Sequence, residues 1–231
     1  SRTENIKIKY LPVSDIETYL IEVSDNDIDL AIIPNPQGVV NLGERNIATP
    51  INKAIDQENL NNKFSDHLIE ITTSKKDKTN YGVWFRLIPN SLNWYDVEKF
   101  KSIGSPEFDS YEDMISFTKD FSSEGNPLWC LDIESGASTG WIATNWLEDL
   151  ILHQQGPDVY DLWSNQELLS GSDEITLSML EIGKLIFIED AVFGGNKRII
   201  RKEFRNNYRK LLEEKNSCVF SWSGHFASTY F

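Results

Sequence analysis

The sequence predicts an α/β protein, and two observations carry that prediction. The first is a succession of strand, helix and strand near the N-terminus. Residues 5–11 alternate apolar and polar, Asp15–Glu22 has the pattern of a short helix, and Ile28–Ile33 is an apolar run. This order is typical of a βαβ unit with a parallel sheet. The second is composition, because 231 residues that are 40% hydrophobic can form one large core or two modest ones.

A break near Pro89 divides the predicted fold into two units. Residues 81–88, YGVWFRLI, have the pattern of a strand that Pro89 ends, and a new pattern begins after it. Residues 1–89 and 90–231 are therefore the expected domains, a smaller and a larger α/β unit.

The second unit is expected to alternate strands with amphipathic helices. Ser110 can cap a helix that carries Met114 and Phe121 on one face. A strand is expected over residues 128–134, and the helix after it repeats apolar residues at four-residue steps. The remaining expected elements are helices at 174–189 and 197–215 and a strand at 218–222.

Charge and hydropathy restrict the classes of partner. The formal net charge of −14 repels nucleic acids and anionic membrane surfaces, so neither is an expected partner. No apolar run approaches the roughly 18 residues that cross a bilayer. No signal-peptide pattern is present, and the chain opens just before a predicted strand and ends in apolar sequence, which predicts cuts through a longer protein.

The segment from Trp129 to Trp146, WCLDIESGASTGWIATNW, places large rings, carboxylates and small polar residues at a strand-to-helix junction. In the predicted strand, Asp132 and Glu134 face the same side about 6.5 Å apart, which is two strand rises. That separation lies between those of retaining and inverting glycosidases, so a catalytic pair is one interpretation. The other is a structural pair, because acidic residues at this spacing are common. Trp129 and Trp146 are expected in the core.

The turn SGASTGW that follows has the features of a binding surface. Ser138 or Thr139 can cap the next helix, and the first backbone N–H groups of that helix then face a ligand. Gly136 and Gly140 permit close approach to the backbone, and Trp141 can stack on a ring. The alternative is an ordinary capped helix with Trp141 wedged between layers.

Other candidate ligand-binding residues have fewer supporting sequence features. The turn PNPQG after Ile33 and the segment WSGHF at residues 222–226 follow predicted strands, at the ends where ligands bind in open α/β sheets. Arg86 has planar donors that suit paired hydroxyls or a carboxylate, and a plain salt bridge explains it as well. The basic run NKRIIRKEFRNNYRK at 196–210 is expected to be a solvated stripe along one helical face, and secondarily a docking surface. The stripe would consist of Arg198, Arg201 or Lys202, Arg205 and Arg209.

Missing motifs favour a binding protein over an enzyme. The sequence has no nucleophile elbow, P-loop, dinucleotide fingerprint or HExxH motif, and no cofactor is predicted. Cys130 and Cys218 are not in a CxxC pair, so no zinc or other metal site is predicted. They are either two buried thiols or one disulfide, and a disulfide requires an oxidising compartment.

Three stretches carry a family resemblance. They are DLAIIPNPQGVVNLGERN, the long stretch from SLNWYDVEKF to NWLEDLIL, and GPDVYDLW, with the densest match at 91–163. Together they resemble the extracellular solute-binding proteins of carbohydrate ABC importers, of family 1 type, and most of all the alpha-glucoside-binding branch. The resemblance implies a periplasmic-binding-protein-like two-lobe fold of the maltose-binding-protein type, truncated at both ends. Residues 1–89 would be part of the N-terminal lobe and 90–231 much of the C-terminal lobe.

Ligand contacts carried over from that resemblance come from three loops. Asn35 and Gln37 match the first cleft loop, and Glu134 through Trp141 match the second. WSGHF matches a loop with ligand-stacking aromatics, and this chain departs from its relatives there, so specificity can differ. The expected ligand-binding residues, with Arg86 included, are Asn35, Gln37, Arg86, Glu134, Ser135, Gly136, Ser138, Thr139, Gly140, Trp141, Trp222, His225 and Phe226.

The resemblance also implies a function. The chain would be the substrate-binding component of an ABC importer and would capture sucrose, trehalose, a maltose-like disaccharide or glucosylglycerol in the cleft between lobes. Its partners would be the sugar and the transmembrane permease subunits, at a periplasmic or extracellular location with or without a lipid anchor. The resemblance favours a Cys130–Cys218 disulfide. The alternatives are a glycoside hydrolase that uses Asp132 and Glu134, and a sensor linked to a chemoreceptor.

Overall fold

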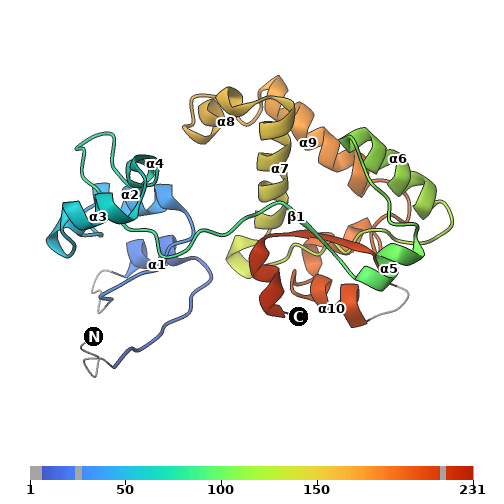
Figure 1. Cartoon of the computed structure of the whole chain (residues 1–231), viewed down its shortest axis with the longest axis horizontal. Helices are drawn as coiled ribbons and strands as arrows, with labels where there is room; N and C mark the ends of the chain where they lie inside the picture. Colours follow the sequence, from blue (N-terminus) through green and yellow to red (C-terminus); the bar gives the residue numbers. More distant parts are fainter. Residues whose placement is uncertain (1–6, 24–27, 214–216, 231) are drawn as a thin grey trace. The chain divides into compact units, whose positions relative to one another are not determined.

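The computed structural model describes residues 7–23, 28–213 and 217–230 of the chain. The chain folds as two compact units, Ser1–Leu87 and Ile88–Phe231, which are called unit 1 and unit 2 below (Figure 1). The division lies next to Pro89, where the sequence pattern restarts.

Unit 1 is built from short helices in the part of it that is described. They are α1 (Ile16–Glu22), α2 (Pro36–Glu44), the 3₁₀ turn η1 (Ile51–Lys53), α3 (Gln57–Lys63) and α4 (Asp66–Ile71). The expected helix at Asp15–Glu22 is confirmed, and the Asp15 carboxylate caps it by accepting the Thr18 N–H at 3.0 Å. Their described apolar core comprises Leu20, Val40, Leu42 and Leu60.

The strands expected in unit 1 are wrong. Residues 28–33 and 81–88 form no strand, and neither do residues 7–11; residues 5 and 6 lie outside the described part. The apolar side chains of these segments face solvent instead, with Leu30 85% and Phe85 78% exposed. Alternation becomes a strand only where a neighbouring strand supplies backbone hydrogen bonds, and the described residues of unit 1 supply such pairing only between Thr73 and Asn80.

Unit 2 contains a small sheet through its centre. Strands β1 (Leu92–Tyr95) and β2 (Phe220–Ser223) pair antiparallel, with Leu92 opposite Ser223. Residues 128–134 run beside β2 as an extended segment, and Trp129 forms parallel bridges to Phe220 on one side and Val192 on the other. The strand expected at 218–222 is thus confirmed as β2. The segment at 128–134 is extended and bonded on both edges, although its pairing consists of isolated bridges.

Helices surround this sheet. They are α5 (Val97–Ser102), α6 (Tyr111–Ser122), α7 (Trp141–Gln154), α8 (Pro157–Ser164), α9 (Asp173–Ile186) and α10 (Asn206–Glu213), with 3₁₀ turns η2 (Gly136–Ser138), η3 (Asn196–Arg201) and η4 (His225–Tyr230). The expected helix after Ser110 is confirmed as α6, and the Ser110 hydroxyl accepts the Asp113 N–H at 3.1 Å. Within the described parts of the chain, every helix is too short or too polar to span a membrane.

The helix expected at 197–215 is wrong as a single element. The chain forms η3 and then, after a break, α10, and residues 214 and 215 lie outside the described part. The basic residues of this run therefore do not share one helical face. Arg198 turns toward the buried Asp132 carboxylate, whereas Arg205 remains exposed and pairs with Glu203 at 2.7 Å.

Stacked rings fill the core of unit 2. Trp129 and Trp146 are fully buried, as expected, with ring centroids 5.8 Å apart, and Trp222 stacks on Trp146 at 5.0 Å. Residues 128–134 are called the central segment below. A disulfide joins Cys130 of this segment to Cys218, just before β2, with Cα atoms 5.3 Å apart. The disulfide and the rings tie the central segment to β2 and α7.

Candidate functional site

An aromatic corner lies at the start of α7. Trp141 is half-buried there, edge-on to Phe204 at 5.3 Å and tilted against Phe226 at 5.4 Å. The three residues come from α7, from the segment before α10, and from η4, so they meet only in the folded unit 2. An aromatic ring that is held by two others and keeps part of its surface exposed can stack on a ligand ring. The term aromatic corner below means Trp141, Phe204 and Phe226.

The turn before α7 is fixed by its own hydrogen bonds. The Thr139 hydroxyl accepts the Ser135 N–H at 3.0 Å and donates to the Gly136 carbonyl at 2.8 Å. The Glu134 carboxylate accepts the Gly136 N–H at 2.7 Å, and the Gly140 N–H donates to the Ile133 carbonyl at 3.1 Å. The turn therefore brings Glu134 and the hydroxyl-bearing residues next to Trp141 in a defined geometry.

The N-cap of α7 differs from the expected one. The cap residue is Gly140, with a φ of 101° and no side-chain hydrogen bond, instead of Ser138 or Thr139. The Thr139 hydroxyl is occupied within the turn, and the left-handed backbone at Gly140 favours glycine. Because no side chain caps the helix, none of the first-turn N–H groups of α7 is bonded by a side chain of the cap residue.

Asp132 and Glu134 do not form a catalytic pair of equivalent carboxylates. The Asp132 side chain is only 1% exposed and pairs with Lys210 at 2.5 Å and with Arg198 at 3.4 Å. Glu134 is half-buried at the turn. This arrangement gives Asp132 a structural role and leaves Glu134 as the carboxylate at the site.

The WSGHF segment divides between core and surface. Trp222 is 8% exposed because it stacks on Trp146, which favours a structural role for its ring. His225 is exposed and its backbone N–H donates to the Pro89 carbonyl at 2.8 Å. Phe226 joins the aromatic corner. Of the three expected ligand contacts in this segment, Phe226 is the one whose ring packs against that of Trp141 at 5.4 Å.

The unit 1 candidates lie at an unexpected helix start. Asn35 caps α2 by accepting the Gln37 N–H at 3.0 Å, and Pro36 occupies the first helical position. The Gln37 amide donates to the Asn41 side chain at 3.0 Å. Arg86 is exposed in the extended segment before Pro89. Asn35 and Gln37 are also exposed, although the Asn35 oxygen and the Gln37 amide nitrogen already make these hydrogen bonds within α2 and its N-cap.

Some aromatic and basic neighbours of the corner were missed from the sequence. The Arg205 guanidinium lies 5.2 Å from the Phe204 ring centroid and 5.8 Å from that of Tyr230. Tyr230 stacks on Tyr208 at 5.2 Å, and burial raises the pKa of Tyr208 to about 12. The sequence signal was the four-residue spacing of Phe204 and Tyr208, which would place both rings on one side of a helix. In the structure Phe204 lies just before α10 and Tyr208 lies within it.

Two hollows in the described part of the surface lie away from the predicted residues. One of about 340 Å³ in unit 1 is lined mainly by polar side chains, and one of about 300 Å³ in unit 2 lies at the end of α6. Neither includes a predicted ligand contact. Within the described ranges, no three His, Cys, Asp or Glu side chains gather where they could hold a metal ion. The candidate site therefore consists of the aromatic corner, the Glu134 carboxylate and the backbone of the turn before α7.

The sequence is similar to two curated binding proteins, although no family model matches it. The osmoprotective compounds-binding protein GgtB of Synechocystis sp. is 25% identical over 202 residues, which cover 87% of this chain and 48% of GgtB. The alpha-glucosides-binding periplasmic protein AglE of Rhizobium meliloti is 26% identical over 98% of this chain and 51% of AglE. The chain spans about half the length of these relatives.

Solved structures give the fold. The solute receptor AcbH has a TM-score of 0.60 and 16% identity, over 84% of this chain and 46% of its own. A chitin oligosaccharide binding protein has a TM-score of 0.59 and 14% identity, over 80% of this chain and 44% of its own. A family 1 extracellular solute-binding protein from Bifidobacterium longum subsp. infantis has a TM-score of 0.54. The chain thus has the periplasmic-binding-protein-like α/β fold, and its resemblance to extracellular solute-binding proteins is confirmed in both sequence and structure.

Proposed function

We propose that the protein is the sugar-binding component of an ABC importer and captures a small alpha-glucoside or a related sugar. The observation that carries the proposal is the half-buried Trp141, held by Phe204 and Phe226 beside Glu134 and the uncapped start of α7. This juxtaposition pairs a flat apolar face with hydrogen-bonding groups of both kinds.

The chemistry of a sugar matches that juxtaposition. A pyranose has an apolar C–H face that covers an aromatic ring and a rim of hydroxyls that need partners. Trp141 supplies the ring, the Glu134 carboxylate accepts from hydroxyls, and the first N–H groups of α7 donate to them. The sugar is bound by these contacts and is released unchanged.

Curated relatives support the ligand class. AglE is named for alpha-glucosides and GgtB for osmoprotective compounds, and the solved neighbours include receptors for β-D-galactopyranose and chitin oligosaccharides. Delivery to permease subunits follows from an import role. A periplasmic or extracellular location is supported by the Cys130–Cys218 disulfide, because such bonds persist in oxidising compartments.

Binding without cleavage is part of the proposal. A glycosidase needs one carboxylic acid and one carboxylate at the scissile bond. Asp132 is buried and neutralised by Lys210, so it is not open to substrate, which supports capture over hydrolysis. The absence of turnover of an aryl alpha-glucoside, measured at high protein concentration, is the expected result. Hydrolysis that Glu134→Gln abolishes would contradict it.

A separate part of the proposal concerns exposed candidate contacts on each unit. They are Asn35, Gln37 and Arg86 on unit 1, and His225 on unit 2. These side chains are exposed and carry donors and acceptors of the kinds that bond sugar hydroxyls. Gln37→Ala leaves the Asn35 cap of α2 in place, so it tests a ligand contact without removing the cap. Weaker sugar binding with unchanged melting is expected.

Isothermal titration calorimetry tests the proposal. Sucrose, trehalose, maltose and glucosylglycerol are titrated into the protein and its Trp141→Ala variant. Saturable binding of one sugar, lost in the variant, is expected. Trp163→Ala is the matched control, because Trp163 is another half-buried tryptophan, on α8 beyond the other end of α7. No binding of any sugar, or equal loss in both variants, would contradict the assignment.

A further inference from the structure

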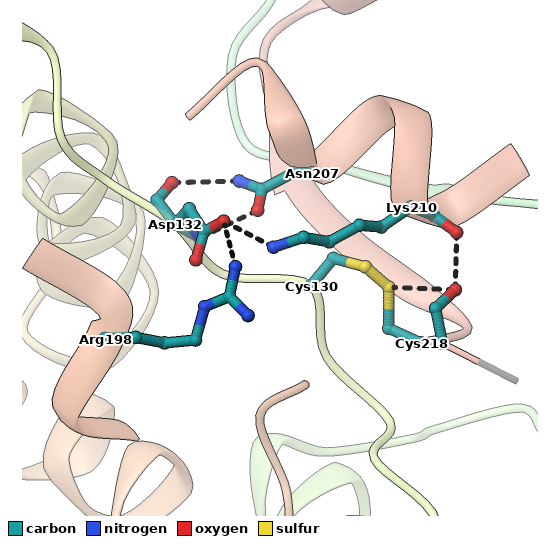
Figure 2. Close-up of polar contacts among 7 residues, drawn as sticks. Cys130, Asp132, Arg198, Asn207, Lys210 and Cys218 are labelled. Carbon is teal, nitrogen blue, oxygen red and sulfur yellow. Dashed lines mark hydrogen bonds and ion pairs between the residues drawn. A yellow bond between two sulfur atoms is a disulfide. The ribbon is translucent and has the colours of Figure 1, made fainter. Parts of the chain in front are cut away.

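The backbone of Asp132 is bonded by a side chain in place of a strand. The Asp132 N–H donates to the Asn207 side-chain oxygen at 2.8 Å, and the Asn207 amide donates to the Asp132 carbonyl at 2.9 Å (Figure 2). Asn207 is 1% exposed. These two bonds reproduce the pair that an antiparallel neighbour makes with one residue. Asn207 therefore fixes the height of Asp132 along the central segment.

The Asp132 carboxylate is held from the same side of the chain. Lys210, one turn after Asn207 on α10, pairs with it at 2.5 Å, and its side chain is 5% exposed. Arg198 of η3 adds a longer contact of 3.4 Å, and its side chain is 27% exposed. Asp132, Arg198, Asn207 and Lys210 are called the polar lock below.

Helix α10, which carries Asn207 and Lys210 of the polar lock, is itself held by further hydrogen bonds at its C-terminal end. The Lys99 ammonium donates to the Leu211 carbonyl at 2.6 Å and to the Ser217 hydroxyl at 2.9 Å, and the Ser217 hydroxyl donates to the Lys210 carbonyl. Cys218 follows Ser217 and is bonded to Cys130, two residues before Asp132. The central segment is thus attached twice to α10 and the residues that follow it. One attachment is the disulfide at Cys218, and the other is the polar lock.

Asp132 of the polar lock lies two residues before Glu134 of the candidate site. Glu134 donates its N–H to the Lys202 carbonyl at 3.0 Å and accepts the Phe204 N–H at 3.0 Å, and Phe204 belongs to the aromatic corner. The Ile133 carbonyl accepts the Gly140 N–H. These three hydrogen bonds therefore depend on where Asp132 is held.

Stability alone is a poor explanation for this arrangement. Desolvation of a buried ion pair costs about as much as the pair returns, and apolar residues of similar volume often do as well or better. A buried pair contributes position, because it admits one geometry. We propose that Lys210, which pairs with Asp132 beside the two Asn207 hydrogen bonds, is a positioning residue that holds the central segment, and with it Glu134 and Trp141, in the binding geometry. The affinity arm of the test rests on the proposed function, whereas the exchange arm does not.

Hydrogen exchange of the ligand-free protein is the first measurement. It follows the turn amides at 135–140 in the wild type, Lys210→Met, Lys210→Arg, and the double variant Asp132→Asn with Lys210→Met. Lys210→Met leaves a buried carboxylate with only the distant Arg198, so a lower melting temperature and roughly tenfold faster exchange of the turn are expected. Lys210→Arg keeps the charge and restores most of the protection. Arg201→Met, at an exposed position of η3, is the control and changes neither quantity.

The double variant separates position from stability. It removes both buried charges, so its melting temperature returns toward that of the wild type. The Asn207 bonds to the backbone of residue 132 remain in this variant, so it isolates the contribution of Lys210. Under the proposal, turn exchange remains fast and sugar affinity remains roughly tenfold weaker, because the Lys210 contact is still missing. Wild-type exchange in this stable double variant would overturn the proposal. Should the wild type bind no sugar, the exchange comparison still decides the positioning role, and only the proposed function fails.

Discussion

Unit 1 and unit 2 use similar apolar content in opposite ways. In unit 2 the strand-like segment at 128–134 is buried, bonded on both edges and attached through Cys130. In unit 1 the segments at 28–33 and 81–88 have comparable apolar patterns, yet Leu30 and Phe85 face solvent. The difference teaches that a β pattern is realised only where partner strands and stacked side chains are available from the rest of the fold.

The largest effect is expected where unit 2 is densest. Trp146→Ala removes a fully buried ring that contacts both Trp129 and Trp222, and a loss of about 3–5 kcal/mol in the free energy of unfolding is expected. Leu30→Ser, its counterpart in unit 1, should change the free energy by less than about 0.5 kcal/mol because the side chain is exposed. Urea unfolding followed by circular dichroism measures both. Equal losses would mean that unit 1 buries Leu30 in solution.

A second large effect concerns the disulfide. The Cys130→Ala and Cys218→Ala double variant opens a link between residues 88 positions apart and should lose roughly 2–5 kcal/mol. Hydrogen exchange should rise in unit 2 and remain unchanged in α1 and α2 of unit 1. Faster exchange throughout both units would instead show that the two units unfold as one, and the contrast between them would fail.

Helix caps give a matched pair of intermediate size. Asn35→Ala removes the cap of α2 in unit 1, and Ser110→Ala removes the cap of α6 in unit 2, each at a cost of about 1 kcal/mol. Because α6 is tied to a large core, Ser110→Ala should shift the main thermal transition. Asn35→Ala should appear mainly as faster exchange within α2. A shift of the main transition by Asn35→Ala alone would reverse the expected ranking of the two units.

The smallest effect is electrostatic. Burial raises the pKa of Glu148 on α7, so folding disfavours its ionised form. Glu148→Gln should therefore raise the melting temperature slightly at neutral pH, and the gain should vanish as the pH falls through the raised pKa, where glutamate is protonated. Glu167→Gln, at an exposed position, is the control. A gain that persists in acid would assign the effect to packing instead of charge.

Local signals predicted α1, α6 and α7. Ser110 was identified as the cap of α6, and the residue patterns at 15–22 and after residue 140 indicated α1 and α7, because helix periodicity and capping depend on neighbours in sequence. The start of α2 was missed although Asn35 and Pro36 carry a cap and a first helical position. Strands depend on distant partners, which explains the errors in unit 1.

The site was predicted only in part for the same reason. Trp141, Glu134 and the turn glycines are contiguous, so their proximity follows from sequence. Phe204 and the partners of Asp132 come from a stretch that looked like one solvated basic helix. Its break between η3 and α10 turns Arg198 and Lys210 inward, and only the folded core, with a buried carboxylate to neutralise, explains that break.

The central claim is that a sugar ring stacks on Trp141. The seven tryptophan indole N–H signals in a ¹⁵N-correlated NMR spectrum can be assigned with single Trp→Phe variants and followed during titration with the sugar that binds. The account predicts a saturable shift of the Trp141 signal, with those of the fully buried Trp129 and of the control residue Trp163 on α8 unchanged. Binding that leaves the Trp141 signal in place would contradict it.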